Sequence, residues 1–153
     1  MKRRKGFTLV ELIIVISVIA ILVGIALPRL RGMIDEGNTA KAAAELRALQ
    51  AGVESYYIHH SKAYPDTSAT AWESALTGAT PTLISTALTD PFSTTTPRAQ
   101  YQYSKTANGK YYAIWSVGPD NTSDVTFNTT TGEITTADDD IYVSNGTSGT
   151  GGF

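Results

Sequence analysis

Residues Phe7 to Leu27 read FTLVELIIVISVIAILVGIAL, an apolar run of 21 residues whose single charged residue is Glu11. With a rise of about 1.5 Å per residue, a helix of this length spans the roughly 30 Å hydrocarbon core of a bilayer. A cleaved secretory signal has a shorter apolar region, about 7–15 residues, and ends in a small-residue cleavage site. The run lacks both features, so it predicts a helix that is retained and crosses the membrane.

A basic cluster, Lys2 to Lys5, precedes this run. Because these four residues are positive and the whole chain carries a net charge of −2, the remainder carries −6. Positive charge beside a spanning helix favours the cytoplasmic side, so we expect a cytoplasmic N-terminus with the rest of the chain outside. The acidic remainder argues against a general nucleic-acid binder.

The composition limits the chemistry that the chain can perform. Its 153 residues suit one domain, and the absence of cysteine excludes disulfides, thiolate metal sites and cysteine nucleophiles. Its two histidines, His59 and His60, are adjacent and favour no multi-histidine metal site. Because no catalytic or phosphate-binding motif occurs in a suitable context, we expect a protein that is not an enzyme.

Glu11 is the unusual residue of the apolar run. A carboxylate at the centre of a membrane helix costs about 2.5–3.5 kcal/mol on insertion scales, and less near an interface. One interpretation is that its side chain reaches the headgroups. The other is that it awaits a positive partner, because pairing removes the cost of a bare carboxylate in apolar surroundings.

The string Lys5-Gly6-Phe7-Thr8-Leu9-Val10-Glu11, followed at once by the apolar run, resembles the prepilin signal of type IV pilins and type II secretion pseudopilins. The resemblance implies that residues 1–6 are a leader, which a membrane prepilin peptidase removes between Gly6 and Phe7. It also implies N-methylation of the new Phe7 amine. In an assembled filament, Glu11 of one subunit would then pair with the Phe7 amine of its neighbour and set the subunit register.

The apolar helix, residues 7–28, contains Gly24 and ends at Pro28. Proline inside a helix removes one hydrogen bond and clashes with the preceding turn, so we expect a kink or break at Gly24 and Pro28. Residues 29–60 continue as an amphipathic helix. Its apolar stripe has spacings of three and four residues, at Leu46, Leu49, Val53, Tyr56/Tyr57 and His60.

The remaining elements predict a globular head over residues 61–143 and a mobile tail over 144–153. Tyr64-Pro65 ends the long helix, and a short helix is expected over 70–76. Strands are expected over 100–104 and 111–117, separated by an Asn108-Gly109 turn, and over 141–143. A further pair, 125–128 and 133–136, is expected across Thr131-Gly132. The fold class is therefore α+β and type IV pilin-like, with one long helix packed on a small antiparallel sheet.

Acidic residues gather in two loops of the expected head. Asp120 follows one strand, and Asp138-Asp139-Asp140 precedes another. Such runs are either screened by solvent or neutralised by a cation such as calcium, which prefers carboxylate and carbonyl oxygens. Major pseudopilins carry similar loops, and the resemblance implies a structural calcium site formed by the side chains of Asp120, Asp139 and Asp140 and the carbonyl of Val117. An insertion over 121–137 leaves open whether Asp124 or Asp138 takes part.

The sequence therefore indicates a structural filament subunit. The Asp90-Pro91-Phe92 step and the acidic loops resemble those of major pseudopilins, and the C-terminal disulfide loop of many adhesive type IV pilins cannot form in a chain without cysteine. The resemblance therefore favours the major pseudopilin of a type II secretion system. Such a subunit polymerises with itself, works with minor pseudopilins and an inner-membrane assembly platform, and moves from the inner membrane into a periplasmic fibre. The alternatives are a cysteine-free type IV or competence pilin that forms a surface filament, and a monomeric membrane-tethered binding domain.

Overall fold

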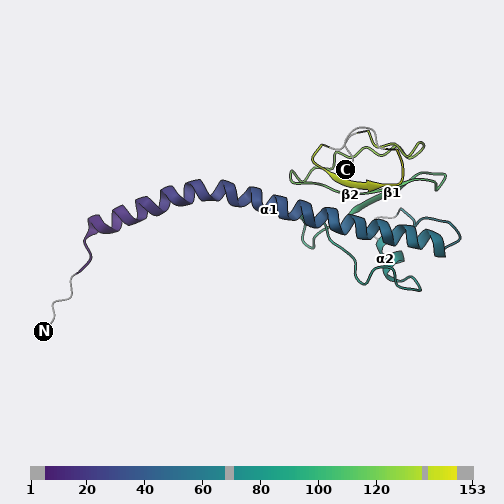
Figure 1. Ribbon diagram of the computed structural model, residues 1–153, viewed down its shortest axis with the longest axis horizontal. Coiled ribbons are helices and arrows are strands. Elements are labelled where there is room, and N and C mark those ends of the chain that lie inside the picture. The colour runs from purple at the N-terminus through teal and green to yellow at the C-terminus, as the bar shows by residue number, and fades with distance from the viewer. Residues whose placement is uncertain (1–5, 68–70, 136–137, 148–153) are drawn as a thin grey trace. The chain divides into compact units, whose positions relative to one another are not determined.

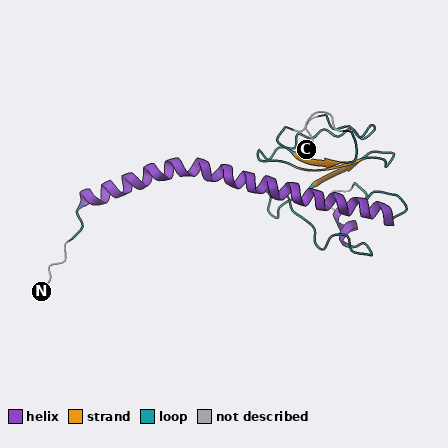
Figure 2. Ribbon diagram, viewed as in Figure 1, coloured by secondary structure: helices purple, strands orange, loops and turns teal. Residues whose placement is uncertain are grey.

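The computed structural model describes residues 6–67, 71–135 and 138–147. The chain forms two units that divide between Gly37 and Asn38. The elements are α1 (Leu9–His59), α2 (Ala71–Thr77), β1 (Gln102–Lys105), β2 (Tyr112–Ser116) and β3 (Ile141–Ser144) (Figure 1). Figure 2 shows that helix dominates the first half of the chain and that the strands come late. These elements confirm the predicted α+β class.

The N-terminal unit consists of the first part of α1. Its apolar window has a mean hydropathy of 3.0 and is long enough to cross a membrane. Every large hydrophobic side chain that it exposes between Phe7 and Ile34 is at least 47 % accessible, a value found at Val15 and Val23. An apolar surface of this extent is unstable in water, so this unit requires lipid or other helices around it.

The α1 ladder is continuous with Pro28 inside it, so the single subunit shows no break at Gly24 and Pro28, and the predicted kink stays a prediction. A proline removes its own bond to the carbonyl four residues earlier, which here belongs to Gly24. The single lost bond is therefore tolerated in the isolated subunit.

The core of the second unit is built on the later part of α1. Ala42, Leu46, Leu49 and Val53 are fully buried, which confirms the predicted stripe. They share one apolar cluster with side chains of the sheet and the loops, namely Tyr64, Trp72, Leu76, Phe92, Tyr101, Tyr112, Ile114 and Ile141. The helix therefore packs on the sheet through residues spaced at three and four positions.

The three strands form an antiparallel sheet in the order β1-β2-β3. Tyr103 pairs with Ile114 across the first ladder, and Ile114 with Val143 across the second. The turn between β1 and β2 contains Gly109, whose φ of 66° lies in the region that glycine adopts without steric cost. The predicted hairpin is therefore confirmed, and β2 is the central strand.

Residues 125–135 pair antiparallel as predicted, but only over a short stretch. A bridge joins Phe127 to Ile134, and backbone hydrogen bonds from the Asn128 N–H to the Glu133 carbonyl and from the Thr135 N–H to the Thr126 carbonyl flank it. In the turn between them, the side chain of Asn128 accepts hydrogen bonds from the N–H groups of Thr130 and Thr131. Thr136, the last residue of the expected pair, lies outside the described residues.

This insertion covers the second face of the sheet. Val125, Phe127 and Ile134 pack with Ala113, Trp115 and Tyr142, a small cluster separate from the main core. All five residues of β2 are consequently buried. The head therefore has a three-layer arrangement of helix, sheet and insertion.

The short helix and the C-terminal tail have boundaries in the structure that differ from the predicted ones. The short helix begins at Ala71 and ends at Thr77, and its predicted anchor Trp72 is 1 % exposed. Ser144 belongs to β3, and the side chain of Asn145 accepts a 2.8 Å hydrogen bond from the Tyr112 N–H. The tail expected from residue 144 is thus ordered at its start, and residues 148–153 lie outside the described part of the chain.

Candidate functional site

The start of α1 carries a reciprocal hydrogen-bonded cap. The backbone N–H and the hydroxyl of Thr8 donate to Oε2 of Glu11 at 3.0 and 2.9 Å, and the Glu11 N–H donates to the Thr8 hydroxyl at 3.2 Å. This is the capping-box arrangement, in which the first helical amides are satisfied by side chains. In the single subunit, Glu11 is therefore held by its own helix terminus.

The predicted processing site lies just before this cap. Gly6 and Phe7 precede the helix, no described residue lies within 4 Å of the position of a Cβ at Gly6, and Phe7 is 80 % exposed. An open, non-helical backbone without a side chain on one flank is what a protease needs to reach a peptide bond. The basic residues expected to flank the site, 2–5, lie outside the described residues.

Three carboxylates of the head converge. Asp120, Asp124 and Asp139 each place one carboxylate oxygen within 4.8 Å of the others. Asp139 Oδ2 accepts a 3.1 Å hydrogen bond from the Asp120 N–H, whereas Asp139 Oδ1 is inaccessible and has no hydrogen-bond partner among the described residues. The structure thus brings together two predicted ligands, Asp120 and Asp139, with Asp124 from the insertion.

Gly118 permits the close approach of these two loops. It adopts a φ of 67°, and a Cβ at this position would lie 2.7 Å from the carbonyl oxygen of Asp139. Any side chain would therefore separate the segment after β2 from the segment before β3. The position two residues before Asp120 requires glycine for this reason.

Asp140, the third predicted ligand, has a different set of partners. Its Oδ2 accepts hydrogen bonds from the N–H groups of Asp124 and Val125 at 2.6 and 2.9 Å, so it holds the beginning of the insertion. Burial raises the pKa of Asp140, the two amides lower it, and the neighbouring Asp124 and Asp139 raise it further. Asp140 is not one of the three converging carboxylates.

Asp90 anchors Val117, the predicted carbonyl ligand. This aspartate is 2 % exposed and accepts hydrogen bonds from the Phe92 N–H, the Ser116 hydroxyl and the Val117 N–H. It thereby ties the loop before β1 to the end of β2 and fixes where the acidic loop begins. The Asp90-Pro91 pair marks a turn in the sequence, but only the structure shows which strand end the carboxylate reaches.

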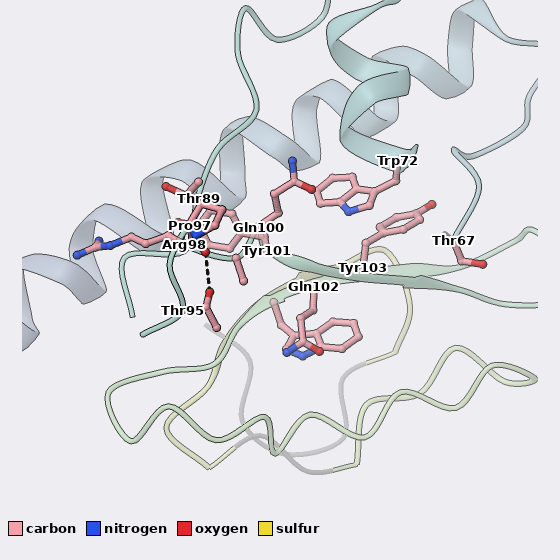
Figure 3. Close-up of a pocket in the computed structure, with 12 residues that line it drawn as sticks. Thr67, Trp72, Thr89, Thr95, Pro97, Arg98, Gln100, Tyr101, Gln102 and Tyr103 are labelled. Carbon is pink, nitrogen blue, oxygen red and sulfur yellow. Dashed lines mark hydrogen bonds between the residues drawn. The ribbon is translucent and has the colours of Figure 1, made fainter. Parts of the chain in front are cut away.

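A groove of about 790 Å³ lies beside β1 (Figure 3). The rings of Trp72 and Tyr103 stack there, with centroids 4.9 Å apart. Its described lining consists of Thr, Trp, Pro, Arg, Ala, Gln and Tyr side chains, with no histidine and no carboxylate.

Two family models match the chain. A model of the prokaryotic N-terminal methylation motif matches residues 1–27. A model of the type II secretion system protein G matches residues 29–131, which is more than half of the chain. The first covers the predicted processing site, and the second covers most of the head.

Individual relatives fall into two groups. Type II secretion system core protein G of Klebsiella pneumoniae is 33 % identical over 67 residues, 44 % of this chain and 47 % of the relative. Its counterpart from Dickeya chrysanthemi is 32 % identical over 66 residues, 43 % and 42 % of the two chains. The type IV major alpha-pilin of Moraxella bovis is 44 % identical over 54 residues, 35 % and 34 %.

The matched region thus spans less than half the length of each of these relatives. No solved structure shows significant similarity to the chain. The extent of the protein G model decides the assignment, since it runs from the amphipathic part of α1 through β1 and β2 into the insertion. The chain belongs to the type II secretion system protein G family.

Proposed function

We propose that this protein is a major pseudopilin, a structural subunit that polymerises into a periplasmic pseudopilus and drives type II protein secretion. The protein G model over residues 29–131 is the observation that carries this proposal. The exposed apolar part of α1 supports it, because a surface of this kind needs membrane lipid before assembly and neighbouring helices afterwards.

Processing would prepare the helix for assembly. A prepilin peptidase would cut between Gly6 and Phe7 and methylate the Phe7 amine, as the methylation-motif match over residues 1–27 supports. In the filament, Glu11 would exchange its bonds with Thr8 for the amine of a neighbouring subunit. Because an unpaired carboxylate is costly in an apolar core, this pairing would favour only one register between subunits.

The orientation and partners follow from the same proposal. The basic cluster would keep the N-terminus in the cytoplasm, with the head on the outer side of the bacterial inner membrane. Minor pseudopilins and an inner-membrane assembly platform would then take the subunit from the membrane into the growing fibre. We expect no nucleic-acid partner for this function.

Exchange of a single carboxylate tests the assembly step. Glu11→Gln in the full chain is expected to leave membrane insertion intact but to abolish filaments and secretion, because the amide cannot form an ion pair. Glu36→Gln is the matched control, since Glu36 is an exposed carboxylate on the same helix. Normal filament yield and secretion by Glu11→Gln would contradict the pairing.

A surface pilus is the second candidate, because type IV pilins are among the relatives. A fimbrial protein of Pseudomonas aeruginosa, for example, is 42 % identical over 55 residues. This candidate predicts abundant protein in filaments sheared from the cell surface. A monomeric tethered domain, the third interpretation, predicts neither filaments nor dependence on Glu11.

Calcium would be a structural ion of the head. We infer that Asp120, Asp124 and Asp139 would hold it, because three carboxylates this close repel one another unless a cation neutralises them. The inaccessible and unpartnered Asp139 Oδ1 fits this role. When bound, the ion would join the segment after β2 to the segment before β3, and Asp140 would hold the insertion beside it.

A further inference from the structure

Glu73 on α2 is a buried carboxyl that the proposed function does not use. It is 0 % exposed, and neither of its side-chain oxygens makes a hydrogen bond of full geometry with the described residues, although the Leu88 N–H lies close enough to favour the charged form in part. An ionised carboxylate in such a place costs much of its solvation free energy, so the charged form opposes burial. The fully buried site therefore requires either a neutral carboxylic acid or movement of α2.

The charge that acts on Glu73 from the described residues is negative, since it belongs to Glu45 on α1. Glu45 in turn pairs with Lys41, which is half exposed and lies 3.7 Å from Glu45 Oε1. Tyr101, the residue before β1, also binds Glu45, because its hydroxyl donates a 2.6 Å hydrogen bond to Glu45 Oε2.

The electrostatics agree with this geometry. Burial raises the pKa of the Glu73 carboxyl to about 7, with a further increase from Glu45 and a partial decrease from the Leu88 N–H. Burial in the core of the head therefore favours the neutral, protonated form of Glu73.

We propose that the docking of α2 in the head is coupled to the uptake of one proton by Glu73, so that the head tightens on acidification and loosens above neutral pH. The folded head binds this proton more tightly than the unfolded chain does. The resulting stability is therefore fully present below the usual pKa of about 4.5 and is lost as the pH rises to about 7. A seven-residue helix has no stability of its own, so α2 is the element that moves.

The two tryptophans make the coupling measurable in the full chain. Trp72 is adjacent to Glu73, and Trp115 lies on β2, whereas α1 contains no tryptophan. Tryptophan fluorescence of the detergent-solubilised chain therefore reports unfolding of the head alone. A chelator must be present at every pH, so that cation binding to the acidic loops does not contribute.

Glu73→Gln tests the proposal, because the amide keeps the shape of the side chain without ionising. At about pH 5 its melting temperature should equal that of the wild type, and at about pH 8 it should be higher by on the order of 5 °C. The control is Glu133→Gln, an exposed carboxylate that should leave the pH dependence unchanged. Parallel pH profiles of Glu73→Gln and wild type would overturn the proposal.

Hydrogen exchange of the wild type provides a second test, which needs no variant to fold. After correction for the intrinsic exchange rate, the amides of α2 should lose protection between about pH 5 and about pH 8, while those of β2 should not. Protection of α2 that is constant over this range would equally overturn the proposal.

Discussion

The hydroxyl of Tyr112 on β2 donates a 2.8 Å hydrogen bond to Oε1 of Glu54 on α1. A second bond of the same kind, 2.6 Å long, joins Tyr101 to Oε2 of Glu45. Both tyrosine rings are buried in the main core, and both carboxylates belong to the amphipathic part of α1. The sheet is therefore fixed to the helix by polar contacts at two points as well as by apolar packing.

Removal of one of these hydroxyls should destabilise the head. Tyr112→Phe keeps the ring and deletes the donor, so we expect the free energy of unfolding to fall by about 1–3 kcal/mol. Tyr142→Phe is the matched control, because the buried Tyr142 hydroxyl has no partner among the described residues. Chemical denaturation followed by tryptophan fluorescence measures both. An equal loss in the two variants would show that the bond to Glu54 contributes nothing.

The buried tyrosines should also make the head sensitive to alkali. Burial, followed by the charge of Glu54, raises the pKa of Tyr64 to about 12. Burial together with the bonds to Glu45 and Glu54 raises the pKa values of Tyr101 and Tyr112 as well.

Because the folded pKa of Tyr64 exceeds the usual value of about 10, its contribution to stability is complete below about pH 10 and is lost as the pH rises through about 12. A fluorescence titration of the full chain should show the head unfolding in this range. The stability of Tyr64→Phe should depend less on pH in this range than the stability of the wild type does. A titration that is identical in the variant would contradict the assignment to Tyr64.

Two glycines with similar backbone conformation should respond differently to a methyl group. Gly118 and Gly109 have φ values of 67° and 66°, but only at Gly118 would a Cβ meet backbone atoms, 2.7 Å from the Asp139 carbonyl oxygen. Gly109→Ala should therefore cost about 1 kcal/mol from the left-handed conformation alone, and Gly118→Ala distinctly more. Thermal melts of the two variants compare these costs, and equal losses would rule out a tight contact between the two loops.

The sequence was sufficient for the main elements because their signals are local. The apolar run and the stripe through Leu46, Leu49 and Val53 predict α1, and Asn108-Gly109 predicts the hairpin. At Pro28 the single subunit shows a continuous helix without a break, and the predicted kink stays a prediction. The expected strand pair around Thr131-Gly132 is present but short, with one bridge between Phe127 and Ile134 and a backbone hydrogen bond on each side of it.

The arrangement of the acidic residues could not be predicted in the same way. The insertion brings Asp124 toward Asp120 and Asp139, and two of its N–H groups donate hydrogen bonds to Asp140. These contacts join segments that are far apart in the chain. Glu73 gives no signal in the sequence, since its spacing on a short helix is equally suited to the surface. Its burial depends on the packing of α2.

Calcium should stabilise the head if the three carboxylates hold it. We expect the ion to raise the melting temperature of the full chain, and Asp139→Asn to remove most of that gain because it deletes a charge from the trio. Asp138→Asn is the control, since Asp138 is exposed and outside the trio. A melting temperature that is indifferent to calcium would exclude the proposed structural ion.

The most direct test of the central claim is the intact mass and N-terminal sequence of the protein, taken from the cell envelope and from sheared surface filaments. The pseudopilin account predicts a methylated chain that begins at Phe7 and is found mainly in the envelope. The same species concentrated in sheared filaments would identify a surface pilus instead. An uncut chain beginning at Met1, in cells with an active prepilin peptidase, would contradict the filament-subunit account altogether.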